Sequence, residues 1–330
     1  MDKHIIMKEF QLPYGKGTLT ARLPNQANVD LIAPQDPPGA PDPLQAVAAA
    51  VSAPLRVDLT HLLSVSRSAA IAINDKTRPV PHQYLLSPLL KRLEAGGIPP
   101  ERIHLIIATG THLPMQPDEF AKILPADLLS RYPVVSHDCD APDLVDLGYT
   151  SRLTPVKINR RFMQADLRIV LGNIEPHHFM GFSGGVKSAA IGLAGRATIV
   201  QNHSMLPEPN AKAGHYEDNP MRQDVEEIGK LARIQLALNA ILNNEKQIVR
   251  VFFGDPVAVM EAGVPLARQI CQVSIQHLYD LVIASAGGYP KDINLYQAQK
   301  ALTHAAMMTR DGGTILLLAA CAEGVGSAGY

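Results

Sequence analysis

The feature that most limits how this chain can fold is a plan that four of its segments share. Each segment begins with a short apolar run, continues through a polar or glycine-rich turn, and leads into a helical pattern; the runs are 69–73, 103–108, 167–171 and 281–284. Continuous apolar runs of this length, separated by helical patterns, are typical of strands buried on both faces of a parallel sheet. The sequence therefore predicts an α/β protein with a mostly parallel sheet.

The turns that follow the first three runs carry polar residues suited to chemistry. Asp75 and Arg78 follow the first run, His112 follows the second, and His177 and Lys187 follow the third. Open α/β sheets bind their ligands at the carboxyl ends of the strands. We therefore expect these five side chains to converge, although they are widely separated in sequence.

The length of 330 residues indicates two domains, because a single hydrophobic core rarely grows that large. We place the boundary near residues 272–279. The prediction is an N-terminal catalytic and cofactor-binding domain over 1–275 and part of a C-terminal domain over 276–330.

Two stretches outside the four segments have readable patterns. Residues 33–54 are rich in Pro and Ala, which favours an extended loop before a short helix. A helical pattern around 221–233 precedes two apolar runs, 236–242 and 247–253, that a polar tetrapeptide joins. These two runs predict a hairpin.

Composition excludes several classes of partner. The formal net charge is −1, which gives no general attraction to nucleic acid or to an anionic membrane. The three cysteines, Cys139, Cys271 and Cys321, are far apart and form no CxxC pair, which argues against a disulfide framework or a thiolate zinc site. The start lacks the apolar core of a signal peptide, and the longest apolar runs are too short to span a bilayer. We expect a soluble cytoplasmic protein.

The densest concentration of reactive residue types is 175–188, followed by Asn202-His203-Ser204. Its glycine-rich turn invites comparison with a P-loop, in which backbone amides approach phosphate and a lysine neutralises charge. That motif has glycine directly before the lysine, where this chain has Val186. A Walker-type NTPase is therefore the weaker interpretation, while a phosphate cradle and a plain tight turn with a solvated Lys187 both stay open.

The histidines of this region are candidate metal ligands or general bases. His177, His178 and His203 each offer an imidazole lone pair to a proton or to a divalent ion. A single histidine is more often a hydrogen-bonded structural residue, but three close together weaken that interpretation. The chain contains no HExxH zincin motif.

Two cationic residues are candidates for binding a carboxylate. Arg78 is suited to a bidentate grip, with Asp75 orienting a neighbour, although a surface ion pair is an equally good explanation. Lys300 follows Tyr296 by four residues on an expected helix, so the two share one face. The alternative for Lys300 is an ordinary solvated lysine.

Six motifs in the same order make the chain similar to one family, the nickel-pincer lactate racemases and their relatives that act on other 2-hydroxy acids. The motifs are 12–21, Asp75 to Pro81, Ala108 to His112, Glu175 to Ser188, Asn202 to Ser204 and Gly287 to Lys300. The resemblance implies a mostly parallel, Rossmann-like sheet with helices on both faces, followed by the start of a second, smaller α/β domain.

The resemblance also implies a cofactor, which is nickel bound by pyridinium-3,5-bisthiocarboxylic acid mononucleotide and covalently attached to a lysine. Matched motif by motif, the implied site is a cofactor-binding set of Lys187, Ser183, Gly184 and Gly185, the nickel ligand His203, the catalytic histidines His112 and His177, and a substrate-binding set of Asp75, Arg78, Tyr296, Gln297 and Lys300.

The implied activity is racemisation or epimerisation of a lactate-like 2-hydroxy acid by hydride abstraction and return, while two histidines handle the hydroxyl proton. The implied partners are that small substrate and, transiently, the proteins that make the cofactor. Two other functions stay open: a phosphate-binding transferase or NTPase that uses the glycine-rich turn, and a non-catalytic carrier of nickel or the cofactor.

The chain departs from the family pattern in three places. Leu113 stands where some relatives have a basic residue, and His178 replaces an aromatic residue after His177. These changes indicate a different 2-hydroxy acid. The family also implies roughly four hundred residues in two domains of ordinary size, so we expect a shortened C-terminal domain here.

Overall fold

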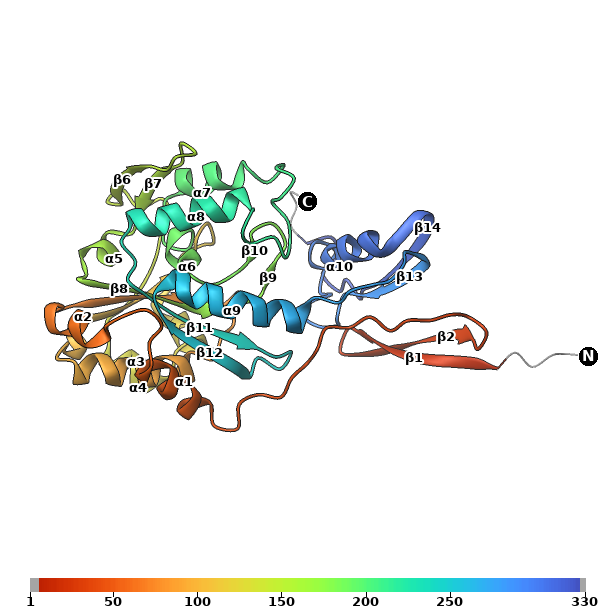
Figure 1. Cartoon of the computed structure of the whole chain (residues 1–330), viewed down its shortest axis with the longest axis horizontal. Helices are drawn as coiled ribbons and strands as arrows, with labels where there is room; N and C mark the ends of the chain where they lie inside the picture. Colours follow the sequence, from red (N-terminus) through yellow and green to blue (C-terminus); the bar gives the residue numbers. More distant parts are fainter. Residues whose placement is uncertain (1–5, 327–330) are drawn as a thin grey trace, which may run out of the picture. The chain divides into compact units, whose positions relative to one another are not determined.

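The computed structural model describes residues 6–326 and divides into two compact units. The larger unit is 34–272, and the smaller combines residues 6–33 with residues 273–326. Residues 6–33, expected from the sequence to belong to the longer domain, are thus in the smaller unit. Figure 1 labels the elements of both units.

The larger unit is built on a six-stranded sheet in the order β12-β11-β8-β3-β4-β5. Every neighbouring pair is parallel except the β11–β12 hairpin, which is antiparallel. The predicted hairpin and the predicted mostly parallel sheet are therefore confirmed. The strands are β3 (Ala69–Asn74), β4 (Ile103–Ala108), β5 (Val134–Ser136), β8 (Leu167–Asn173), β11 (Leu236–Leu242) and β12 (Ile248–Gly254).

Helices cover both faces of this sheet, as Figure 1 shows. Alternate residues of β3 point to opposite faces: Ile71 and Ile73 join one hydrophobic cluster, and Ala70 and Ala72 join the other. The first cluster packs under α1 (Pro43–Ser52), α2 (Leu59–Val65), α3 (His82–Ala95) and α4 (Ala126–Arg131); the second packs under α5 (Arg160–Gln164), α6 (Lys187–Ala190), α7 (Arg196–His203), α8 (Pro220–Leu231) and α9 (Pro256–Cys271).

The start of α8 shows how local sequence sets a helix boundary. The Asn219 side chain accepts a hydrogen bond from the N–H of Arg222, and Pro220 occupies the first turn, where a missing N–H costs nothing. The helix predicted around 221–233 is therefore confirmed to within two residues at its C-terminal end.

Shorter elements connect the main ones. Two 3-10 turns, η1 (Pro100–Arg102) and η2 (Pro117–Lys122), flank β4. Two small antiparallel pairs lie outside the main sheet: β6 (Val145–Tyr149) with β7 (Pro155–Ile158), and β9 (Pro176–His177) with β10 (Gly181–Phe182).

The smaller unit contains the fourth predicted apolar run, which forms a sheet of its own. This run is part of β13 (Tyr279–Ser285), which pairs in parallel with β14 (Thr309–Leu318) across α10 (Leu295–Met308). The antiparallel hairpin of β1 (Met7–Tyr14) and β2 (Gly17–Pro24) joins this unit, because the Gly15 N–H donates to Asp292 and the Ser285 hydroxyl donates to the Pro13 carbonyl. Within residues 6–326, no helix has the length and apolar character needed to cross a membrane.

Candidate active site

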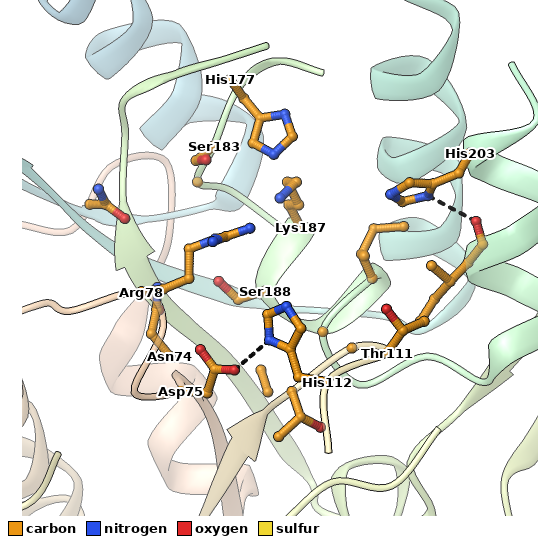
Figure 2. Close-up of a pocket in the computed structure, with 18 of the residues that line it drawn as sticks. Asn74, Asp75, Arg78, Thr111, His112, His177, Ser183, Lys187, Ser188 and His203 are labelled. Carbon is orange, nitrogen blue, oxygen red and sulfur yellow. Dashed lines mark hydrogen bonds and ion pairs between the residues drawn. The ribbon is translucent and has the colours of Figure 1, made fainter. Parts of the chain in front are cut away.

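A cleft opens at the carboxyl ends of three central strands of the larger unit. Asn74, Ala108 and Asn173 are the last residues of β3, β4 and β8, and all three line it. The turns that follow supply the chemically reactive side chains, which Figure 2 shows around one cavity. The sequence-predicted residues that line the cleft are Asp75, Arg78, His112, His177, Ser183, Gly184, Lys187 and His203.

Asp75 holds His112 in a defined orientation. The His112 Nδ1 lies 2.7 Å from the Asp75 Oδ2, and the other carboxylate oxygen accepts bonds from the Thr77 N–H and hydroxyl. Burial alone would raise the pKa of Asp75, which is 3% exposed, but the bonds from His112 and Thr77 outweigh burial and lower it. A charged carboxylate at this position makes Nδ1 the proton-bearing nitrogen of His112, so its Nε2 is left with a lone pair.

His177 is buried and is held differently. Its Nδ1 accepts a bond of 3.3 Å from the Met180 N–H, so the neutral ring carries its proton on Nε2. Burial lowers the pKa of His177 strongly, and the charges of Lys187, His178 and Arg78 add to that effect. The imidazole is therefore neutral in this structure.

His203 presents a free lone pair for another reason. It ends α7, and its Nδ1 lies 2.8 Å from the carbonyl oxygen of Ile199, one turn earlier. The carbonyl accepts, so Nδ1 carries the proton and Nε2 is the available nitrogen, which is a common arrangement of metal-ligating histidines. Burial lowers the pKa of His203, although the bond to Ile199 opposes it. The edge of the Phe179 ring packs against the imidazole, with 5.1 Å between ring centroids.

A buried network holds the end of α7, next to His203, in place. The Asn202 side chain donates to the Asp224 carboxylate at 2.8 Å and to the Met221 carbonyl at 3.1 Å. The same carboxylate accepts from the hydroxyls of Thr150 and Thr154, and all these side chains except Met221 are buried polar groups. These bonds rigidify the helix end that carries His203, although the Asn202 Oδ1 has no partner of its own among the described residues.

Lys187 begins α6 at the end of the glycine-rich turn. Gly184 and Gly185 adopt φ of +93° and +57°, which glycine tolerates best. Among residues 6–326, no hydrogen bond or ion pair reaches the Lys187 amine. Burial, Arg78 and Arg222 lower its pKa to about 7, and Glu175 opposes them. A substantial fraction of the amine is therefore neutral and nucleophilic at neutral pH.

Gly185 differs from the sequence prediction, because it is not among the residues that line the cleft. Its N–H donates to the Asn239 side chain at 2.7 Å, and a Cβ added there would lie 2.5 Å from the Arg222 guanidinium. Gly185 thus packs against the interior of the unit. The close packing and the positive φ account for glycine at this position, and its role in cofactor binding stays a prediction.

The remaining predicted residues are on α10 in the smaller unit. The Lys300 amine donates to the Gln297 side chain at 2.7 Å, and Tyr296 precedes Lys300 by one helical turn. The role of these three residues in binding substrate stays a prediction.

Several residues that line the cleft were not predicted. Asn74 and Asn173 end apolar strands, and the Ser188 hydroxyl donates to the Leu171 carbonyl at 3.0 Å. Phe179 separates two of the histidines, since its ring contacts both His177 and His203. The sequence feature that could have identified the two asparagines as lining residues is their position, as a polar residue directly after an apolar run.

The α/β fold, with oriented imidazoles and a near-neutral amine in one cleft at the strand ends, places the chain in the broad class of α/β enzymes. Comparison with known proteins narrows that class. A family model described as the lactate racemase N-terminal domain matches residues 14–214, and a model of the lactate racemase C-terminal domain matches residues 275–330.

Individual relatives agree. The chain is 31% identical to the lactate racemases of Lactiplantibacillus plantarum and Thermoanaerobacterium thermosaccharolyticum, over 98% of this chain and 77% of each relative. The solved lactate racemase apoprotein from T. thermosaccharolyticum superposes with a TM-score of 0.90 at 30% identity, covering 98% of this chain and 76% of that one. A Thermotoga maritima protein, with a TM-score of 0.62 at 20% identity over 86% and 72% of the two chains, shares the fold.

The chain belongs to the lactate racemase family, and it is an isomerase of that type. The family assignment made from the six motifs is confirmed.

Proposed function

We propose that this chain racemises or epimerises lactate or a related 2-hydroxy acid with a nickel-pincer nucleotide attached to Lys187. One observation carries the proposal: His112, the pair His177 and Lys187, and His203 come from three separate segments and line one cleft. The relatives named lactate racemase support the reaction type.

The residues present fit the proposed cofactor. Attachment through an amide-like bond needs a neutral amine, and the pKa of Lys187, about 7, supplies one near neutral pH. Nickel accepts imidazole nitrogen, and the His203 Nε2 is available because Nδ1 is engaged by Ile199. Ser183 and Gly184 line the same cleft as Lys187. When bound, the group would supply a site that accepts a hydride from the substrate carbon and returns it.

The two catalytic histidines would exchange the hydroxyl proton of the substrate. His112 is ready to act as a base, because Asp75 holds the proton on Nδ1 and stabilises the imidazolium that forms when Nε2 accepts a second proton. His177 has no carboxylate partner among the described residues, and its neutral ring presents Nε2–H; to accept the hydroxyl proton at Nε2 it would first have to carry its own proton on Nδ1 and give up the bond from the Met180 N–H. The two imidazoles are therefore chemically unequal, although both serve the same oxygen in the proposal.

Charged side chains would hold the substrate carboxylate. Arg78 lines the cleft, and its planar guanidinium suits bidentate recognition of a carboxylate. We propose that Tyr296, Gln297 and Lys300 of α10 complete this binding. A carboxylate held in this way would direct the substrate hydroxyl towards the histidines of the cleft.

The test is intact-mass spectrometry with metal analysis on protein made together with cofactor-biosynthesis proteins. We expect a covalent adduct on the wild-type chain, its loss in Lys187→Ala, and retention of the adduct with loss of nickel in His203→Ala. Lys230→Ala, an exposed lysine change on α8, is the matched control and should keep both.

Three results would contradict the proposal. An adduct that persists in Lys187→Ala would place the attachment elsewhere. Loaded protein that fails to interconvert the two enantiomers of lactate and of other short 2-hydroxy acids would favour a cofactor carrier. Nucleotide hydrolysis by the unloaded protein would favour the phosphate-binding alternative.

A further inference from the structure

Arg222 contacts the glycine-rich turn from the side away from the cleft. It is the largest of the fully buried side chains among residues 6–326, at 1% exposure, and it does not line the cleft. Its Nη1 donates to the carbonyl oxygen of Gly184 at 3.0 Å and to that of Phe182 at 3.4 Å. One guanidinium therefore binds two carbonyls of the segment that leads to Lys187.

The rest of the guanidinium is fixed by other partners. Its Nε donates to the Glu226 carboxylate at 2.8 Å, and its Nη2 donates to the same oxygen. The Tyr216 ring stacks 4.9 Å from the guanidinium carbon, and its hydroxyl donates to Glu226. Contacts on every side leave Arg222 a single orientation.

The glycine-rich turn is packed against this arrangement with no free space. A Cβ on Gly185 would lie 2.5 Å from the Arg222 Nη2 and 2.8 Å from the Met260 side chain, and a Cβ on Gly229 would lie 2.7 Å from the Val186 side chain. Asn239 accepts from the Gly185 N–H at 2.7 Å. Both the carbonyls and the amide of the turn are therefore tied to the interior.

We infer that Arg222 is a positioning residue for Lys187: by holding the Phe182 and Gly184 carbonyls from behind, it fixes the turn that brings the Lys187 amine into the cleft. The purpose of this positioning rests on the proposed attachment of the cofactor to Lys187. The effect of Arg222 on the reactivity of the Lys187 amine does not rest on that proposal, because it is measurable on unloaded protein.

The electrostatic surroundings of the amine agree with this geometry. Arg78, Arg222 and Glu175 are the charged groups that act on Lys187, and the Lys187 charge in turn lowers the pKa of His177 and of His203. Arg78 and Arg222 are permanent cations, and the amine is buried among these groups. A turn that relaxed away from Arg222 would let water reach the amine and favour its charged form.

The experiment is trace labelling of unloaded protein with acetic anhydride between pH 6 and pH 10, with mass spectrometry of the peptide that contains Lys187. Arg222→Lys keeps a positive charge but loses the planar guanidinium that donates to the two carbonyls. We expect the midpoint of Lys187 reactivity to rise by about one pH unit, which lowers the neutral fraction at pH 7 roughly fivefold.

The matched control is Arg168→Lys, at the opposite end of β8. The Arg168 guanidinium also donates to backbone carbonyls, those of Met163, Ala165 and Arg233. Its loss should lower the melting temperature without moving the Lys187 midpoint. A wild-type midpoint in Arg222→Lys, or an equal shift in both variants, would overturn the inference.

If Arg222→Lys does not fold, Glu226→Gln takes its place with the same readout and the same criterion, because it keeps the Arg222 charge and removes the carboxylate that fixes the guanidinium. Failure of the proposed function would appear separately, as an absent adduct on wild-type protein that still shows a Lys187 midpoint near pH 7.

Discussion

The two units of this chain differ in how they are stabilised. The larger unit packs two hydrophobic clusters on opposite faces of a six-stranded sheet. The smaller unit has paired strands and one helix, and its fully buried side chains are Asp292, Ala298 and Ala305 within the described residues. Side chains such as Leu281 and Leu316 are exposed on its sheet. The larger unit therefore has its own rigid hydrophobic core, whereas the smaller unit buries few side chains.

The difference teaches where precise geometry is available. His112, His177, Lys187 and His203 extend from turns anchored to buried strands or from the end of a packed helix. Residues on such elements hold their positions well enough for proton transfer and metal binding. The predicted substrate-binding residues of α10 belong to the less buried unit. We expect reaction steps to depend on the larger unit, and substrate affinity to depend on both.

The largest effect should follow loss of a catalytic histidine. His112→Ala or His177→Ala should lower kcat on loaded enzyme about 10²- to 10⁴-fold, because each removes a group that exchanges the hydroxyl proton. Adduct and nickel should be unchanged by mass and metal analysis. His61→Ala, an exposed histidine change on α2, is the control. Wild-type rates for both enantiomers in either variant would refute the catalytic role.

Asp75→Asn should reduce kcat on the order of 10²-fold, since an amide neither holds the proton on the His112 Nδ1 nor stabilises the imidazolium. Burial would raise the pKa of Asp75, but bonds from His112 and Thr77 lower it, so the carboxylate stays charged above its ordinary pKa of 3.8 and loses its charge only in stronger acid. A pH–rate profile of the variant tests this. An unchanged rate at pH 7 would mean that His112 needs no orienting partner.

Lys300→Met should raise KM about tenfold and leave kcat within a few-fold, because the variant loses one charged contact with the substrate carboxylate. Lys8→Met, which removes an exposed lysine from β1 of the same unit, is the matched control. Steady-state kinetics with each enantiomer provide the measurement. Loss of adduct or nickel in Lys300→Met would break the contrast between the two units.

The smallest effect concerns stability. The pKa of Lys187 falls from 10.5 to about 7 on folding, so between these values the unfolded chain binds more protons and stability rises with pH. The penalty of burying this amine is complete below pH 7 and absent above pH 10.5. Lys187→Met should therefore raise the unfolding free energy at pH 7 by on the order of 1–3 kcal/mol, a gain that shrinks towards pH 10. A gain in melting temperature independent of pH would contradict the lowered pKa.

Sequence patterns predicted the core of the larger unit well. The apolar runs 69–73, 103–108 and 167–171 lie within β3, β4 and β8, and the 236–253 hairpin is present. These elements were predictable because strands buried on both faces need uninterrupted apolar residues. The turns at their carboxyl ends then had to meet at one edge of the sheet. For this reason residues as far apart in sequence as Arg78 and Ser188 line one cleft.

Other features had no local signal. Arg222 and Glu226 are four residues apart on a helix, a spacing that ordinarily indicates a solvent-exposed ion pair, yet Arg222 is buried. In the sequence, nothing distinguishes Gly185 from Gly184 in the glycine-rich turn, but in the structure Gly185 packs against the interior of the unit. The β1–β2 hairpin precedes the larger unit in sequence and still belongs to the smaller one.

By itself, the sequence determined the family, the order in which the reactive turns follow one another along the chain, and the set of imidazole and amine groups available for chemistry. The tertiary structure decided which nitrogen of each histidine is free, why the Lys187 amine is near-neutral, and which buried cation supports its turn. The physical reason is that tautomer, pKa and orientation depend on hydrogen-bond partners and burial, which come from segments distant in sequence.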